Sequence, residues 1–174
     1  EEIVPALDAV GDRFEKKTLF LPQLLMSAEA AKAAFEVIKS QLKGEEDTKR
    51  SHLTIVIATV KGDVHDIGKN IVRVLLENYG FHVIDLGKDV PPETVLEAVK
   101  KEKAQLVGLS ALMTTTVVNM KETIELLRKE TPHVKVMVGG AVLTQEYADS
   151  IGADFYGKDA MASVRYATEL AESI

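Results

Sequence analysis

Beyond residue 52, short apolar runs alternate with segments of helical spacing, and this alternation constrains the fold more than any other feature of the chain. Runs of strand character, rich in Val, Ile and Leu, are predicted at 53–60, 81–86, 105–110, 134–138 and 154–156. Helical spacing follows each run, at about 69–78, 92–102, 116–129, 144–150 and 160–172. Continuously apolar strands are typical of a parallel sheet covered by helices on both faces. Five successive βα units therefore predict a doubly wound α/β fold.

The common strand orders for such a chain include the flavodoxin-like (Rossmann-like) order 2-1-3-4-5, which we take as the prediction. In this order, ligands bind at the carboxyl ends of strands one and three, where the winding reverses. The unusual loops of the chain follow those two strands. The first loop carries Asp63, His65 and Gly68, and the second carries a cluster of hydroxyls within 110–116. We therefore expect the functional site at this edge of the sheet.

Residues 1–43 carry two helical patterns and are predicted to form a helical cap that is part of a helix bundle. The first pattern is a stripe of apolar residues at helical spacing: Ile3, Leu7, Val10 and Phe14. The second extends over 21–42, is rich in Ala and has Pro22 near its first turn. Residues 44–51 are charged and lack apolar periodicity, so they are predicted to be a linker before an α/β domain at 52–174.

Composition narrows the classes of partner. With 21 basic and 27 acidic residues, 5% aromatic residues and no Trp, the chain lacks the charge and the stacking platform of a nucleic-acid-binding protein. It has no Cys, which excludes disulfides and thiolate metal sites and suits a reducing compartment. No apolar run approaches the roughly 20 residues of a membrane span, and the first residues lack the pattern of a signal peptide. We expect a cytoplasmic protein that binds neither nucleic acid nor membrane.

The loop at 62–68 presents one imidazole between glycines, which suits several ligands. A phospho-receiver domain would need an aspartate at the end of strand three, where the chain has Ser110. Neither G-x-G-x-x-G nor G-x-x-x-x-G-K-[ST] follows the first strand, so nucleotide sites of those classes lack support. His65 remains either a simple loop histidine or a ligand to a divalent ion with Asp63 and Asp66, although no distant fourth ligand is obvious.

Two further elements at the same predicted edge each have two interpretations. Gly139 and Gly140 after the fourth strand either form a tight turn or let a ligand approach the backbone closely. Thr114 and Thr115 either line a site or cap the helix that follows. The residues alone do not decide between these alternatives.

The segment 57–70, IATVKGDVHDIGKN, resembles the signature of cobalamin-binding domains of the methionine synthase and corrinoid methyltransferase type. The family's elements D-x-H-x-x-G, S-x-L and G-G occur in its order and at its usual separations, as Asp63-His65-Gly68, Ser110-Leu112 and Gly139-Gly140. The resemblance covers essentially the whole chain, including the helical part. It implies cobalamin or a related corrinoid as cofactor, methylated on cobalt during turnover.

The resemblance also implies roles for single residues. His65 would be the axial ligand to cobalt in place of the corrinoid's own lower base, Asp63 would bind the other imidazole nitrogen, and Thr116 would bind Asp63. The further residues implied around the cofactor and its displaced nucleotide tail are Gly62, Val64, Asp66, Gly68, Ser110, Leu112, Thr114, Gly139, Gly140 and Ala160. Those implied in the cap over the upper corrin face are Phe14, Leu21 and Leu25. For Leu112, Ala160 and the cap stripe, ordinary packing is the alternative.

Two departures distinguish the chain from methionine synthase and resemble the small free-standing corrinoid proteins. It has Thr114-Thr115-Thr116 where methionine synthase has a Pro-Ser pair, and it stops directly after the last predicted helix. Such proteins carry a methyl group from a substrate-specific methyltransferase to an acceptor methyltransferase that uses coenzyme M or tetrahydrofolate, and they are not catalytic alone. A reductive activation protein is a further expected partner. The alternatives are the cobalamin-binding domain of a methionine synthase and a corrinoid-sensing regulatory module.

Overall fold

The structure is a computed structural model that describes residues 3–41 and 53–174. It divides into two compact units, Glu1–Lys49 and Arg50–Ile174. The predicted linker at 44–51 lies outside the described residues. Among the helices of the described ranges, none combines the length and the apolar character that a membrane crossing requires.

The first unit contains a pair of helices, α1 (Ile3–Glu15) and α2 (Leu21–Gln41). The turn between them is fixed by local hydrogen bonds. The backbone N–H and the hydroxyl of Thr18 both donate to the carbonyl of Arg13, at 2.9 and 3.0 Å. The backbone N–H of Phe20 donates to the side-chain oxygen of Gln23 at 2.8 Å, the reach-back bond typical of a helix start.

The second unit is a parallel sheet of five strands in the order β2-β1-β3-β4-β5, which confirms the predicted topology. The strands are β1 (Thr54–Thr59), β2 (His82–Asp85), β3 (Leu106–Ser110), β4 (Lys135–Gly139) and β5 (Phe155–Gly157). The helices are α3 (Ile67–Asn78), α4 (Pro92–Glu102), α5 (Val117–Glu130), α6 (Gln145–Ser150) and α7 (Ala160–Ser173). Each predicted strand and helix of this region is present, with ends that differ by a few residues at most.

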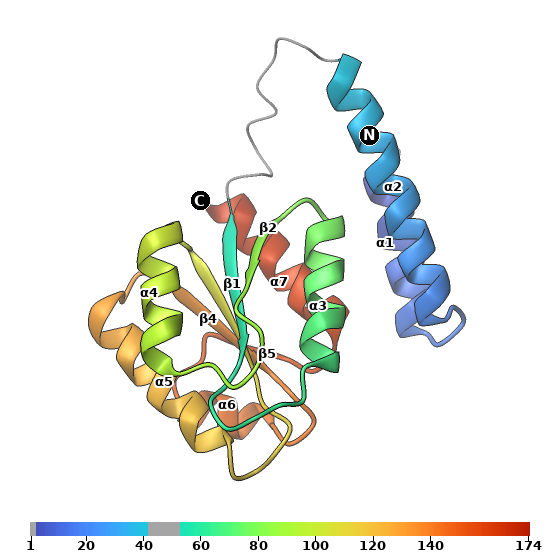
Figure 1. Cartoon of the computed structure of the whole chain (residues 1–174). Helices are drawn as coiled ribbons and strands as arrows, with labels where there is room; N and C mark the ends of the chain where they lie inside the picture. Colours follow the sequence, from blue (N-terminus) through green and yellow to red (C-terminus); the bar gives the residue numbers. More distant parts are fainter. Residues whose placement is uncertain (1–2, 42–52) are drawn as a thin grey trace. The chain divides into compact units, whose positions relative to one another are not determined.

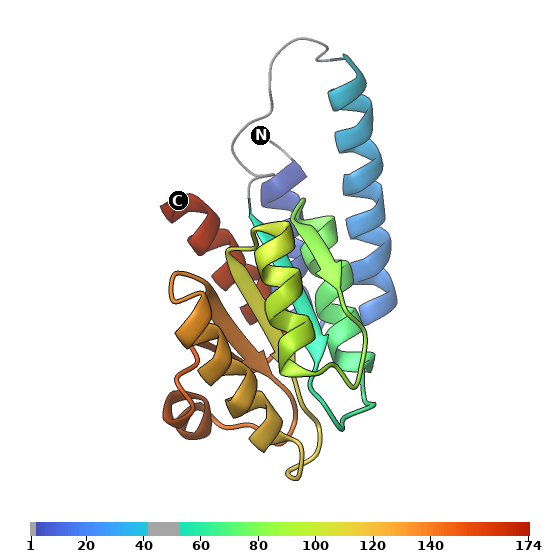
Figure 2. The same cartoon turned by 60° about the vertical axis from the view of Figure 1, so that its left-hand side comes forward.

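Helices cover both faces of the sheet, so its central strands are buried on both sides. Figure 1 shows α4 and α5 on one face and α3 and α7 on the other, and the rotated view in Figure 2 shows the same layers. On the α4–α5 face, Val56 and Ala58 of β1 belong to one apolar cluster with Ile124 of α5. Ile55 and Ile57, the alternating residues of β1, are also buried. This two-sided burial explains why β1 is apolar without interruption.

The register of the sheet brings the motif-bearing loops to one edge. Thr59, the last residue of β1, pairs with Ser110, which pairs with Gly139, which pairs with Gly157. The last residues of four strands therefore form a single row. The loops that follow β1, β3 and β4 leave the sheet from this row, at the lower edge in Figure 1.

Gly140 follows this row and has a backbone conformation that favours glycine, with φ of +139°. A Cβ atom at this position would lie 1.8 Å from the carbonyl oxygen of Ala111, in the loop after β3. The backbone of Ala111 also donates a hydrogen bond to the carbonyl of Gly139, at 3.2 Å. Close packing of two loop backbones therefore requires glycine at position 140.

We expect Gly140→Ala to destabilise the protein by about 1 to 3 kcal/mol from the strained backbone alone, with a further cost from the overlap with Ala111. Gly68→Ala is the matched control, because a Cβ there meets no atom within 4 Å and φ is not positive. Alanine in a helix is about 0.5 to 1 kcal/mol more favourable than glycine, so the control should be neutral or stabilising. Urea denaturation measures both variants. Equal stabilities would contradict the packing argument.

Candidate functional site

The loop between β1 and α3 is organised around the carboxylate of Asp63, whose side chain is fully buried. Its Oδ1 atom accepts a hydrogen bond from the backbone N–H of His65 at 3.0 Å and lies 2.8 Å from the Nδ1 atom of the same residue. Its Oδ2 atom accepts hydrogen bonds from the backbone N–H groups of Leu112 at 2.7 Å and Met113 at 3.2 Å. One carboxylate thus joins the loop after β1 to the loop after β3.

Thr116, which precedes α5, adds a third donor to the same carboxylate oxygen. Its hydroxyl lies 2.8 Å from Asp63 Oδ2 and 2.8 Å from the carbonyl oxygen of Met113. A hydroxyl has one hydrogen and donates to one acceptor at a time. The charged carboxylate is the stronger acceptor of the two. The hydroxyl of Thr116 therefore donates to Asp63 in preference to Met113, and this is the contact that the resemblance implies.

These contacts decide the protonation of Asp63. Burial raises the pKa of its carboxyl group, but the hydrogen bonds from the backbone of His65 and Leu112, and from the side chains of His65 and Thr116, outweigh this effect. The pKa of Asp63 consequently lies well below its usual range. Asp63 is a carboxylate at neutral pH and can only accept hydrogen bonds.

The charge of Asp63 in turn fixes the tautomer of His65. Because the carboxylate only accepts, the Nδ1 atom of His65 must carry hydrogen to bind it. In a neutral imidazole, the Nε2 atom then has a free lone pair. The side chain of His65 is 46% exposed, and Nε2 has no hydrogen-bond partner among the described residues. His65 is therefore prepared to bind a Lewis acid through Nε2.

Large apolar side chains are exposed in the loops after β1 and β3 and at the starts of the helices that follow. Val64 and Ile67, which flank His65 in sequence, are 55% and 79% exposed, and Leu112 beside Asp63 is 41% exposed. Val118, in the first turn of α5, is 53% exposed. The one other large apolar residue that is exposed in the described α/β unit is Ile174, the last residue of the sequence. A group of exposed apolar side chains marks a binding surface.

The row of strand ends contributes two neighbouring hydroxyl residues, Thr59 and Ser110. The hydroxyl of Thr59 is buried and has no hydrogen-bond partner within the described part of the chain. A buried polar atom without a partner costs about 1 to 3 kcal/mol. Thr59 was not predicted from the sequence, because a threonine at the end of a β-branched strand looks like ordinary strand composition. The unpaired hydroxyl of Thr59 is therefore a candidate hydrogen-bond partner for a polar group of a ligand.

The other predicted residues lie around the same edge. Gly62 has φ of +82°, and its backbone N–H donates to the side chain of Asp89 at 2.6 Å. Asp66 precedes α3 without capping it through its side chain, and Gly68 in the first turn faces open space. Thr114 is exposed, and Ala160 is the half-buried first residue of α7.

The divalent-ion alternative has no support in this geometry. Within residues 3–41 and 53–174, no group of three His, Cys, Asp or Glu side chains is arranged to hold a metal ion. Asp63 and His65 instead bind each other. A metal bound at His65 would need most of its ligands from another source.

The predicted cap residues lie on the helices of the first unit. Phe14 belongs to α1, Leu21 and Leu25 belong to α2, and all three are half-buried. Leu24, which was not predicted, is 1% exposed. Its neighbours Phe20 and Met26 are 72% and 69% exposed. The roles of Phe14, Leu21 and Leu25 toward a ligand stay predictions.

Comparison with known proteins gives a consistent result for both units. A B12 binding domain family matches residues 53–165, and a second B12 binding domain family matches residues 1–39. The trimethylamine corrinoid protein 1 of Methanosarcina mazei is 49% identical over 156 residues, which cover 88% of this chain and 72% of that protein. The dimethylamine corrinoid protein 1 of the same organism is 45% identical over 170 residues, covering 97% of this chain and 78% of that protein.

A solved structure agrees with these relatives. A chain in the crystal structure of the methanol:cobalamin methyltransferase complex from Methanosarcina barkeri superimposes with a TM-score of 0.81 at 34% identity. The match covers 99% of this chain and 66% of that chain. The resemblance seen in the sequence motifs is thus confirmed, and this chain belongs to the family of B12-binding corrinoid proteins.

Proposed function

We propose that this chain is a corrinoid-dependent methyl carrier with His65 as the axial ligand to cobalt. The observation that carries the proposal is the Asp63–His65 pair, in which a buried carboxylate holds Nδ1 and leaves Nε2 free beside exposed apolar side chains. A corrinoid fits this arrangement because its macrocycle supplies the equatorial ligands and presents a broad, largely apolar face. One protein ligand is then sufficient, in keeping with the lack of a three-residue metal cluster in the described chain.

The row of strand ends suits the displaced nucleotide tail of such a cofactor. The buried hydroxyl of Thr59 needs a polar partner, and Ser110 lies beside it in the register. The open space at Gly68 leaves room for a ligand close to the first turn of α3. We propose that Gly62, Val64, Asp66, Leu112, Thr114, Gly139, Gly140 and Ala160 line the remainder of the site, with Phe14, Leu21 and Leu25 as its cap.

The residues of this chain would bind and orient the cofactor and control its lower ligand, while the cobalt of the bound corrinoid would supply the methyl-transfer chemistry. Asp63 orients the imidazole of His65 and increases its basicity as a ligand. Thr116 and the backbone N–H groups of Leu112 and Met113 fix the position of Asp63 in turn. The protein can thereby set the strength of one cobalt bond.

The relatives indicate the class of methyl donor. Two are named trimethylamine and dimethylamine corrinoid proteins, and a third belongs to a methanol:cobalamin methyltransferase complex. We therefore propose a methylamine or a related one-carbon compound as donor, a substrate-specific methyltransferase as first partner and an acceptor methyltransferase for coenzyme M or tetrahydrofolate as second. A reductive activation protein would restore the reduced cobalt. These names favour the carrier over a methionine synthase domain or a regulatory sensor.

Replacing His65 tests the proposed ligand directly. We expect His65→Ala, loaded with methylcobalamin, to show the absorption spectrum of the form without a lower nitrogen ligand. His133→Ala is the matched control, since His133 is an exposed histidine in the loop before β4, and it should keep the wild-type spectrum. If His65→Ala keeps that spectrum with a methylated corrinoid that lacks its own lower base as well, His65 is not the ligand.

Asp63→Asn tests the tautomer argument. Oδ2 accepts from the N–H groups of Leu112 and Met113 and from Thr116, so an amide at position 63 should place its oxygen there and its NH2 group toward His65. An NH2 donor facing Nδ1 would move the imidazole hydrogen to Nε2 and remove the free lone pair.

We therefore expect Asp63→Asn to lose the His-ligated spectrum about as fully as His65→Ala. Thr116→Val should have a smaller effect, because the backbone N–H groups of His65, Leu112 and Met113 still donate to Asp63. Absorption spectra of the loaded variants measure both. An Asp63→Asn protein with the wild-type spectrum would show that the charge of Asp63 does not select the tautomer.

A further inference from the structure

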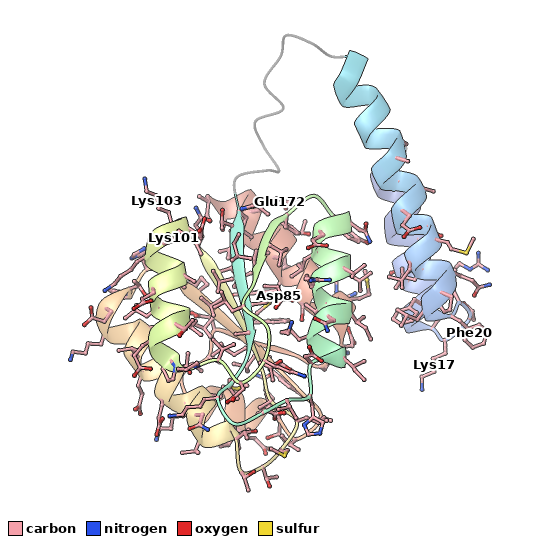
Figure 3. The ribbon with its side chains drawn as sticks, viewed as in Figure 1. Lys17, Phe20, Asp85, Lys101, Lys103 and Glu172 are labelled. Carbon is pink, nitrogen blue, oxygen red and sulfur yellow. The ribbon has the colours of Figure 1, made fainter. Side chains whose placement is uncertain are left out.

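Lys69, in the first turns of α3, is a buried lysine with two hydrogen-bond partners. The residue is 4% exposed. Its Nζ atom donates to Asp85 Oδ1 at 2.6 Å and to the side-chain oxygen of Asn70 at 2.8 Å. Asp85 ends β2 and lies between that strand and α3 in Figure 3. Lys69 therefore ties the helix that follows His65 to the neighbouring strand.

Asp85 connects this helix to the next loop as well. The Oδ1 atom that binds Lys69 also accepts the backbone N–H of Gly87 at 2.9 Å, and Oδ2 accepts from Arg73 at 3.3 Å. Burial raises the pKa of Asp85, but the contacts with Lys69, Gly87 and Arg73 lower it further than burial raises it. Asp85 is thus a charged carboxylate that binds both α3 and the loop after β2.

The loop after β2 then reaches the segment that precedes His65. The backbone N–H of Asp89 donates to the carbonyl of Asp63 at 2.9 Å, and its carboxylate accepts the N–H of Gly62 at 2.6 Å. Asp89 has φ of +55°, which is uncommon for a residue other than glycine, although aspartate tolerates it. Two hydrogen bonds to Gly62 and Asp63, in the loop that carries His65, therefore hold Asp89 in an unfavourable backbone conformation.

Together these contacts close a ring through the chain that carries His65. The ring runs from Asp63 along the backbone to Lys69, across to Asp85, and back through Asp89 to Asp63. Stability alone is a weak reason for such an ion pair, because replacing a buried pair by apolar residues is often neutral or stabilising. A better explanation for the ion pair is that it helps to fix the position of His65, which lies between Asp63 and Lys69 in the chain.

We propose that Lys69 and Asp89 are positioning residues that clamp the chain on either side of His65 and so hold its imidazole in place for cobalt. This inference rests on the proposed function, because it concerns the same axial ligand. Partners that orient a metal ligand typically contribute about 10-fold to 100-fold in metal affinity. We expect the clamp to act at the lower end of this range, because Asp63 still holds Nδ1 when the clamp is broken.

The test compares two pairs of variants of the full chain loaded with cobalt(II) cobalamin. Lys69→Met removes the buried ammonium group but keeps an unbranched apolar stem, and Lys100→Met breaks the exposed ion pair between Lys100 and Glu130 as a control. Asp89→Ala removes the carboxylate, whereas Asp89→Asn keeps an acceptor oxygen and tolerates the same backbone conformation. The second pair changes an exposed residue, so it remains informative if Lys69→Met fails to fold.

Free imidazole enriched in the heavy nitrogen isotope serves as competitor, and electron paramagnetic resonance distinguishes its nitrogen coupling from that of His65. We expect Lys69→Met and Asp89→Ala to lose His65 ligation at about one-tenth of the wild-type competitor concentration, while Lys100→Met and Asp89→Asn stay near wild type. A merely structural role would lower the melting temperature without changing this concentration.

The outcomes separate the clamp from the proposed function. If His65→Ala loses the nitrogen coupling but both Lys69→Met and Asp89→Ala compete like wild type, the clamp is wrong and the axial ligand stands. If His65→Ala keeps the coupling when loaded with a cobalt(II) corrinoid that lacks its own lower base, the clamp and the proposed ligand are both wrong. If Asp89→Asn is as weak as Asp89→Ala, the contact with the N–H of Gly62 is not what positions the loop, and the proposal for Asp89 is overturned.

Discussion

The buried carboxylate of Asp63 is the interaction on which the functional edge of this fold depends. It is fully buried, yet hydrogen bonds from two loops hold it in the charged form. The charge then requires the hydrogen of His65 on Nδ1 and leaves Nε2 free. A buried charge without these donors would be strongly unfavourable. The parallel sheet supplies them by bringing the ends of β1 and β3 side by side.

Two layers of contacts support the histidine, and they act on different parts of it. Asp63 sets the ring orientation and tautomer of His65 through Nδ1. The ring of contacts through Lys69, Asp85 and Asp89 instead acts on the backbone on both sides of the residue. Under the proposed function, a cobalt bond from His65 would depend on both sets of contacts, because a fixed tautomer on a displaced backbone would not bring Nε2 to the metal. The proposed positioning role would account for the ion pair between Lys69 and Asp85, which has no contact with the imidazole.

Much of this arrangement follows from the sequence, and the remainder depends on contacts between distant residues. The β-branched runs and the helical spacing predicted each strand and helix of the sheet, and α3 begins at Ile67, two residues before the predicted start. Thr116 and Asp63 are 53 residues apart, so family resemblance and not spacing indicated their contact. Lys69 and Thr59 were missed, since a lysine in a helix and a threonine in a strand usually need no special explanation. Only the fold shows that the first is buried and that the second lacks a partner.

The tautomer of His65 in the cofactor-free protein is the most direct test of the central claim. Nitrogen-detected NMR distinguishes the two neutral tautomers of a histidine by the coupling of each ring nitrogen to the ring protons, and the chain has only four histidines to assign. The account predicts that His65 carries its hydrogen on Nδ1 at neutral pH, and that Asp63→Asn moves it to Nε2. A wild-type His65 with its hydrogen on Nε2 would contradict the account.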